Sequence, residues 1–156
     1  MNEAIIILGI ILSIMFYEIT EMSPGGLIVP GYFALFLNDP KRIIMTVLVA
    51  FLSIIVVKFL SKYTVLYGRR KFAVYIIITF LIKLFFESLD LNILIGGEVI
   101  GILIPAILAK DIESNGISKT LPALLILSIT IKSIYVLTEV FIWNTRKKLY
   151  IYNVYW

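Results

Sequence analysis

The side chains that could do chemistry in this chain are a few ionisable residues set inside long apolar stretches. Lys83 and Glu87 stand four positions apart and therefore share one face of a helix. Lys132 and Glu139 stand seven apart and share a face of another helix. Because a charge in hydrocarbon is costly, the two residues of each pair should either neutralise each other or line a water-filled path. For Glu139 the alternative is a side chain that reaches the membrane interface.

The composition removes most other chemistries. The chain has no Cys and no His, which excludes thiolate nucleophiles, disulfides, imidazole bases and the usual zinc sites. No Gly-rich phosphate loop follows a strand pattern. An independent active site would have to rest on carboxylates, Lys, Tyr or Ser. We expect no metal ligand and no cofactor in this chain.

A run of bases, Arg69, Arg70 and Lys71, stands in the middle of the chain with no acid beside it. The simplest interpretation is a topology anchor. The functional interpretation is an electrostatic binding site for a polyanion or for an acidic surface of a partner protein.

A nine-residue apolar motif is repeated, as GLIVPGYFA from position 26 and as GILIPAILA from position 101, a spacing of 75 residues. An acid that follows two aromatic residues stands upstream of each copy, Glu18 before the first and Glu87 before the second. Such Gly- and Pro-interrupted segments in two halves indicate a duplicated membrane protein whose broken segments lie at its functional site. Chance recurrence in an apolar chain is the alternative. The residues expected to shape a path there are Gly26, Pro30, Gly31, Gly101 and Pro105.

Composition predicts the fold class. Of the 156 residues, 61% are hydrophobic and only 15% are charged, so most of the chain must face lipid or other membrane helices. We predict an all-α integral membrane protein with about four transmembrane helices and two short Gly/Pro-broken segments, re-entrant or half-helical, in an internally duplicated arrangement. The predicted spans are residues 2–17, 43–60, 72–86 and 121–142, and the broken segments are residues 27–37 and 99–109.

The chain is expected to form a single membrane domain over residues 1–142, with repeat halves of about 1–62 and 72–142. A basic and aromatic tail follows at residues 143–156. The net charge of +4 is better explained by membrane orientation and anionic headgroups than by nucleic acid.

The orientation depends on how the broken segments lie. The positive-inside rule places the basic clusters at residues 58–71 and 146–148 in the cytoplasm, together with the N-terminus. This arrangement works if each broken segment enters and leaves on one face, which makes the halves parallel and leaves Lys41 and Arg42 outside. If the broken segments cross completely, the halves are inverted and one basic cluster faces outward. We favour the re-entrant, parallel arrangement.

Several motifs resemble a known family. PGGLIVPGY at residues 24–32, YGRRKF at 67–72 and IKLFFE at 82–87 resemble, in this order, the PgsC/CapC family, the small membrane subunits of bacterial poly-γ-glutamate capsule synthase. The resemblance runs across approximately residues 5–140. The second repeat has Pro105-Ala106 where the first has Pro30-Gly31, so the two halves need not do equivalent work.

The resemblance implies a partner relationship. In that family a separate Mur-ligase-like subunit binds ATP and joins glutamates through their γ-carboxyls, and the membrane subunit is needed for synthesis and passage of the polymer. It implies here a non-catalytic, multi-pass subunit of the bacterial cytoplasmic membrane, with ATP and Mg on the ligase. The implied partners are the ligase, other capsule-synthase membrane subunits, poly-γ-glutamate and the lipid bilayer, and not nucleic acid.

On this basis Arg69, Arg70 and Lys71 would dock the ligase or guide the polymer. Lys83 would contact carboxylates, and Glu18 and Glu87 would orient these bases.

Other function classes stay open. The same layout suits a small transporter for an anion or an amino acid, which works as a homo-oligomer without a ligase. A membrane-embedded acyl- or aminoacyl-transferase would need convergent polar groups in one pocket, and the sequence offers few.

Overall fold

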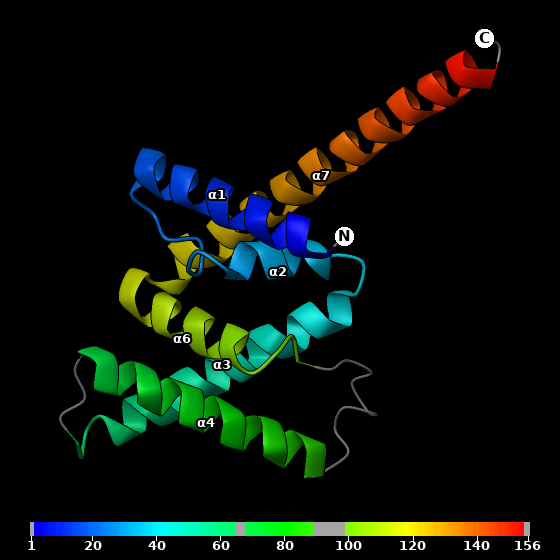
Figure 1. The fold of residues 1–156 in the computed structure, drawn as a ribbon. Helices are drawn as coiled ribbons and strands as arrows, with labels where there is room; N and C mark the ends of the chain where they lie inside the picture. The colour runs from blue at the N-terminus through cyan, green and yellow to red at the C-terminus, as the bar shows by residue number, and fades with distance from the viewer. Residues whose placement is uncertain (1, 65–67, 89–98, 155–156) are drawn as a thin grey trace.

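The computed structural model describes residues 2–64, 68–88 and 99–154, with the side chains of residues 3–64, 68–88 and 99–141. Every regular element in these ranges is a helix, so the all-α prediction is confirmed. The helices lie side by side in a stack (Figure 1). They are α1 (Asn2–Thr20), α2 (Val29–Leu35), α3 (Pro40–Leu60), α4 (Gly68–Ser88), α6 (Leu103–Asn115) and α7 (Ile117–Val154).

Three of these helices are long and apolar enough to cross a membrane, and they match three of the predicted spans. The apolar stretches are Glu3–Thr20 in α1, Pro40–Leu60 in α3 and Ile117–Phe141 in α7. The fourth predicted span forms α4, but α4 is not among the three. Its apolar run is bounded by a basic first turn and interrupted by Lys83 and Glu87.

Each broken segment becomes a short helix that follows a non-helical stretch. Pro30 lies in the first turn of α2, and Pro105 lies in the first turn of α6. Proline is tolerated there because the first N–H groups of a helix have no intrahelical acceptor. The half-helix form of the prediction therefore agrees with the structure. α6 also continues to Asn115, beyond the predicted limit at residue 109.

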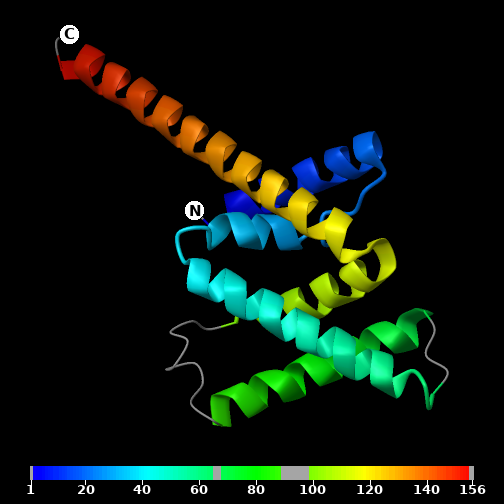
Figure 2. The same ribbon diagram turned by 180° about the vertical axis from the view of Figure 1, so that it is seen from behind.

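Successive helices run in alternating directions (Figures 1 and 2). α1 and α3 run one way, and α4 and α7 run the other way. Lys71 at the start of α4 forms an ion pair with Glu113 near the end of α6, with 2.8 Å between Nζ and Oε2. The start of α4 and the end of α6 thus lie on the same side of the molecule, the left side in Figure 1.

This ion pair contradicts the re-entrant, parallel arrangement, which places residue 71 in the cytoplasm and residue 113 outside. That arrangement is wrong. The prediction failed because the positive-inside rule placed both basic clusters, at residues 58–71 and 146–148, on the cytoplasmic face. The start of α4 and the end of α7 instead lie on opposite sides of the molecule, left and right in Figure 1.

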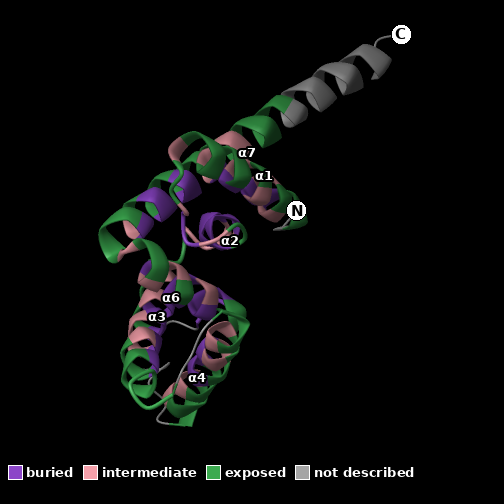
Figure 3. Cartoon of the chain, turned by 90° about the vertical axis from the view of Figure 1, so that its left-hand side faces the viewer, coloured by how far each residue is buried: buried purple, intermediate pink, exposed green. Residues whose placement is uncertain are grey.

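The short helices provide much of the core. α2 packs against α1 and α7, and α6 packs against α3 and α4. α2 is almost entirely enclosed, whereas α4 and α7 present exposed residues to the outside (Figure 3). The largest fully buried side chains include Phe33 of α2, Tyr75 of α4 and Leu108 of α6.

α1 and α2 cross at a pair of glycines. A Cβ atom on Gly9 would lie 2.5 Å from the Cα atom of Gly31, and one on Gly31 would lie 3.2 Å from the Cα atom of Ile6. Missing side chains let membrane helices approach closely enough for strong backbone packing. Gly31 therefore acts in this structure through helix packing.

Replacing Gly9 with Val should separate α1 from α2, because the neighbour that must move is backbone. We expect a loss of about 1–3 kcal/mol of folding free energy, the usual cost of overpacking, measured by thermal unfolding in detergent micelles. Ala4→Val places the same isopropyl side chain on the exposed face of α1 and is the control. Equal unfolding temperatures for the two variants would contradict the close crossing.

Candidate functional site

The predicted basic run forms the first turn of α4. Arg69 and Arg70 are exposed, and neither forms an ion pair within the described residues. Lys71 is held by Glu113, and both of these side chains are mostly covered. The prediction of three unopposed cations is therefore wrong for Lys71. The two arginines are exposed bases of this end whose side chains an external anion could reach.

The local electrostatics favour an anion beside these arginines. The first turn of α4 holds three bases and no acid. The amide dipoles of a helix add partial positive charge at its N-terminus, so cations there are destabilising and an anion is stabilising. Arginine also binds carboxylates through two parallel hydrogen bonds.

Two acids that sequence reasoning missed organise this end of the molecule. Glu113 pairs with Lys71. The Asp111 carboxylate accepts a hydrogen bond from the backbone N–H of Gly25 through Oδ2, at 2.9 Å, and one from the Asn115 side chain through Oδ1, at 3.2 Å. The only sign of them in the sequence was their position directly after the second broken segment, where charged residues follow the apolar repeat.

α6 is tied to the start of α4 by a second contact. The Lys110 ammonium lies 5.6 Å from the ring centroid of Phe72, within the range of a cation–π attraction. Together with the ion pair between Lys71 and Glu113, this contact fixes the position of Arg69 and Arg70 relative to α6.

The predicted path-shaping residues are mostly packing positions in this structure. Gly26 has φ +97°, and a Cβ atom on it would lie 2.7 Å from the Cγ2 atom of Ile107. It therefore needs glycine both for its backbone conformation and for its close approach to α6. Pro30 and Pro105 are buried, and Gly101 is exposed with φ +59°.

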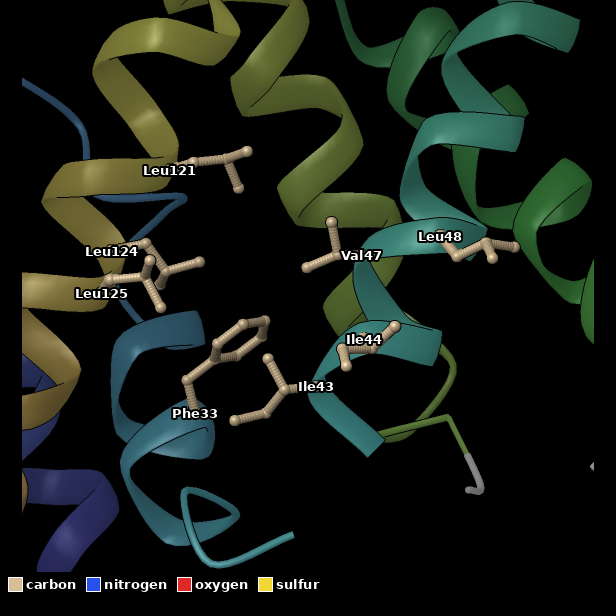
Figure 4. Close-up of a pocket in the computed structure, with 8 residues that line it drawn as sticks. All are labelled: Phe33, Ile43, Ile44, Val47, Leu48, Leu121, Leu124 and Leu125. Carbon is tan, nitrogen blue, oxygen red and sulfur yellow. The ribbon is translucent and has the colours of Figure 1, made fainter. Parts of the chain in front are cut away.

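A groove of about 380 Å³ opens between α2, α3 and α7. Its walls are apolar, with Phe33 of α2 facing α3 and α7 (Figure 4). A polyanion would find no polar partner on these walls, so this groove is not a candidate site for one. The lining side chains are Phe33, Ile43, Ile44, Val47, Leu48, Leu121, Leu124 and Leu125.

α4 carries a polar residue at every fourth position from its first turn to its last. Within this row, Lys83 and Glu87 are 3.4 Å apart, as their spacing predicted. Thr79 is fully buried, and its hydroxyl lies 3.0 Å from the hydroxyl of Ser53 on α3. The complete row is Lys71, Tyr75, Thr79, Lys83 and Glu87.

The remaining predicted charges lie apart from this row. Glu139 accepts a hydrogen bond from the Tyr135 hydroxyl at 2.7 Å, and no ion pair joins it to Lys132 within the described residues. Glu18 is exposed in the last turn of α1. Among the residues that the structure describes, no ion pair joins it to any of the predicted bases, and Lys71 is paired with Glu113 instead.

Comparisons with known proteins identify the same family that the sequence motifs indicated. Residues 8–121 match the family described as capsule biosynthesis CapC. The chain is 40% identical over 129 residues to the PGA biosynthesis protein CapC of Bacillus subtilis (strain 168), a match that covers 79% of this chain and 85% of that protein. It is 34% identical over 128 residues to the capsule biosynthesis protein CapC of Bacillus anthracis, with the same coverage. No solved structure matches. The chain therefore belongs to the CapC family of capsule biosynthesis proteins.

Proposed function

We propose that this protein is the membrane subunit of a poly-γ-glutamate capsule synthase. It supports polymerisation by a separate ATP-dependent, Mur-ligase-like subunit and the passage of the polyanion across the membrane. Family membership and the name of the Bacillus subtilis relative support this assignment. The structural observation that carries it is the exposed Arg69–Arg70 pair, which forms no ion pair in the part of the chain that the structure describes, at one end of a bundle of apolar helices.

We further propose that α4 is a fourth span and that the chain is an inverted duplication in the bacterial cytoplasmic membrane. Residues 75 positions apart share backbone conformation or hydrogen bonding, which supports this proposal. Gly26 and Gly101 both have positive φ. Ser53 and Ser128 are both fully buried, and each donates to the carbonyl group four residues earlier.

The packing supports the same proposal. α2 packs on α1 and α7, while α6 packs on α4 and α3. Exchanging the two halves leaves this pattern unchanged, because the third helix of each half covers the short helix of the other. Corresponding helices also run in opposite directions (Figures 1 and 2), as in inverted repeats related by a pseudo-two-fold axis in the membrane plane.

At the exposed arginines, the partner is an acidic surface of the ligase or the growing polymer itself. Each γ-linked glutamate carries a free carboxylate, which a guanidinium group binds well. A membrane potential that is negative inside favours outward movement of such a polymer by about 2.3 kcal/mol per charge per 100 mV. Passage then requires a path through the bilayer, and the chain needs no ATP or Mg of its own.

A small transporter for an anion or amino acid, without a ligase, is a second candidate function. The observation that favours it is the opposed direction of corresponding helices, which is common among secondary transporters. Uptake of labelled glutamate by proteoliposomes that contain only this protein would support the transporter, and polymer formed only with the ligase would support the synthase subunit.

The arginine pair gives the most direct test of the synthase assignment. Arg69→Gln/Arg70→Gln should lower polymer yield roughly tenfold or more while the protein stays in the membrane, because each lost charge-assisted hydrogen bond is worth about 1.5–3 kcal/mol. The measurement is poly-γ-glutamate made by membranes that also contain the ligase. Lys119→Gln removes another exposed base and should leave the yield unchanged. Normal yield from the double variant would leave only the topology role for these arginines.

Lys83 tests whether a charge within α4 meets the polymer. Lys83→Met keeps the side-chain volume and removes the charge, so we expect a clear loss of polymer synthesis if the ammonium contacts carboxylates. Lys83→Met/Glu87→Gln separates this role from neutralisation of Glu87. If neutralisation is the whole role, the double variant recovers synthesis. Recovery in the double variant, or full synthesis with Lys83→Met alone, would rule out a polymer contact at this position.

A further inference from the structure

A second groove, of about 410 Å³, lies between the end of α3 and the junction of α6 with α7. It differs from the groove in Figure 4 because charged side chains take part in its lining. We call it the α3-end groove. It is lined by Phe51, Ile54, Ile55 and Lys58 from α3 and by Ile112, Glu113, Gly116 and Ile117 from the other side.

The α3 wall changes from apolar to basic along the helix. Phe51, Ile55, Lys58 and Lys62 follow one another in steps of four, three and four residues, which keeps them on one face. Lys62 lies about one turn beyond Lys58, in the hydrogen-bonded turn that follows α3, where its N–H donates to the carbonyl of Phe59; it stands next to the groove and is not part of its lining. Seven residues at 1.5 Å each separate Phe51 from Lys58, so the apolar wall is about 10 Å long.

Neither lysine has an acidic partner among the residues that the structure describes. Both are exposed, and neither forms an ion pair within the described residues. Glu113 lines the same groove, but its Oε2 atom is held by Lys71. Like charges four residues apart on a helix repel each other. A cation near the C-terminus of α3 is favourable, which accounts for one lysine and leaves the repulsion between the two.

We propose that the α3-end groove binds an anionic phospholipid. Its acyl chain lies along Phe51, Ile54 and Ile55, and its phosphate lies between Lys58 and Lys62. The order of the side chains matches the lipid, because the apolar wall points toward the middle of a helix that is long and apolar enough to cross a membrane and the cations stand at its end. Basic pockets between membrane helices are known lipid headgroup sites.

A glutamate polymer fits this groove less well. It carries a carboxylate on every residue and has no long apolar part to cover the isoleucine and phenylalanine wall, whereas a phospholipid brings both an anion and a chain. The bound lipid would close the gap between α3 and the α6–α7 junction. This role is separate from ligase docking and polymer passage.

The test compares retention of phosphatidylglycerol and phosphatidylcholine by the full-length protein, using native mass spectrometry from detergent micelles. Each lysine near a membrane surface is worth about 1 kcal/mol toward an anionic lipid. The wild-type protein should therefore prefer phosphatidylglycerol by roughly thirtyfold. Lys58→Gln/Lys62→Gln should abolish this preference. Lys41→Gln/Lys119→Gln removes two exposed lysines elsewhere and should keep it.

A second pair of variants tests the apolar wall without changing charge. Ile55→Trp places bulk in the groove and should reduce retention of phosphatidylglycerol, whereas Val56→Trp changes the neighbouring exposed residue, outside the lining, and should not. Equal retention of the two lipids by the wild type would overturn the proposal, as would a preference that survives Lys58→Gln/Lys62→Gln. Displacement of phosphatidylglycerol by oligo-γ-glutamate would also overturn it and assign the lysines to the polymer.

Discussion

A carboxylate on α6 holds the turn that leads into α2. Asp111 accepts the Gly25 N–H at 2.9 Å, a contact between residues 86 positions apart. Beside it, the missing side chain of Gly26 lets Ile107 approach the backbone. The hydrogen bond fixes the position of the chain just before α2 relative to α6, and so positions both short helices. Once α6 is in place, Lys110 and Glu113 reach Phe72 and Lys71 and set the start of α4.

The second broken segment is held in a related way. The N–H of Ile100, which stands 75 positions after Gly25, donates to the Thr46 hydroxyl of α3 at 3.0 Å. In the proposed inverted duplication, each broken segment is thus anchored at its entry by a side chain from the other half. A buried N–H without a partner would cost about 1–3 kcal/mol. The two hydrogen bonds therefore make the halves depend on each other, and neither half is expected to fold alone.

Local patterns in the sequence predicted the local structure well. Apolar run length identified the helices that could cross a membrane, and the Gly-Pro phrase identified where two short helices begin. A spacing of four residues identified the Lys83–Glu87 pair. The family resemblance came from motifs that membrane insertion alone does not require, and the comparisons confirmed it.

What the sequence could not supply were contacts between distant segments. Nothing near Lys71 indicates Glu113, and nothing near Gly25 indicates Asp111, because a single sequence carries no record of which distant residues meet. Gly9 was passed over for the same reason, since its role depends on Gly31 of another helix. α7 continues without a break to Val154, so residues 143–154 of the predicted basic and aromatic tail are helical.

In the proposed inverted duplication, the broken segments carry the chain across the membrane, so that the ends of α3 and α6 lie on one side. Single cysteines test this cleanly, because the natural chain has none. We would introduce Thr64→Cys, Asn115→Cys and Asn38→Cys separately, all at exposed positions, and treat intact cells with a membrane-impermeant maleimide. Positions 64 and 115 should then react alike, and position 38 should react in the opposite way. Labelling of positions 64 and 115 from opposite sides of the membrane would contradict the inverted duplication.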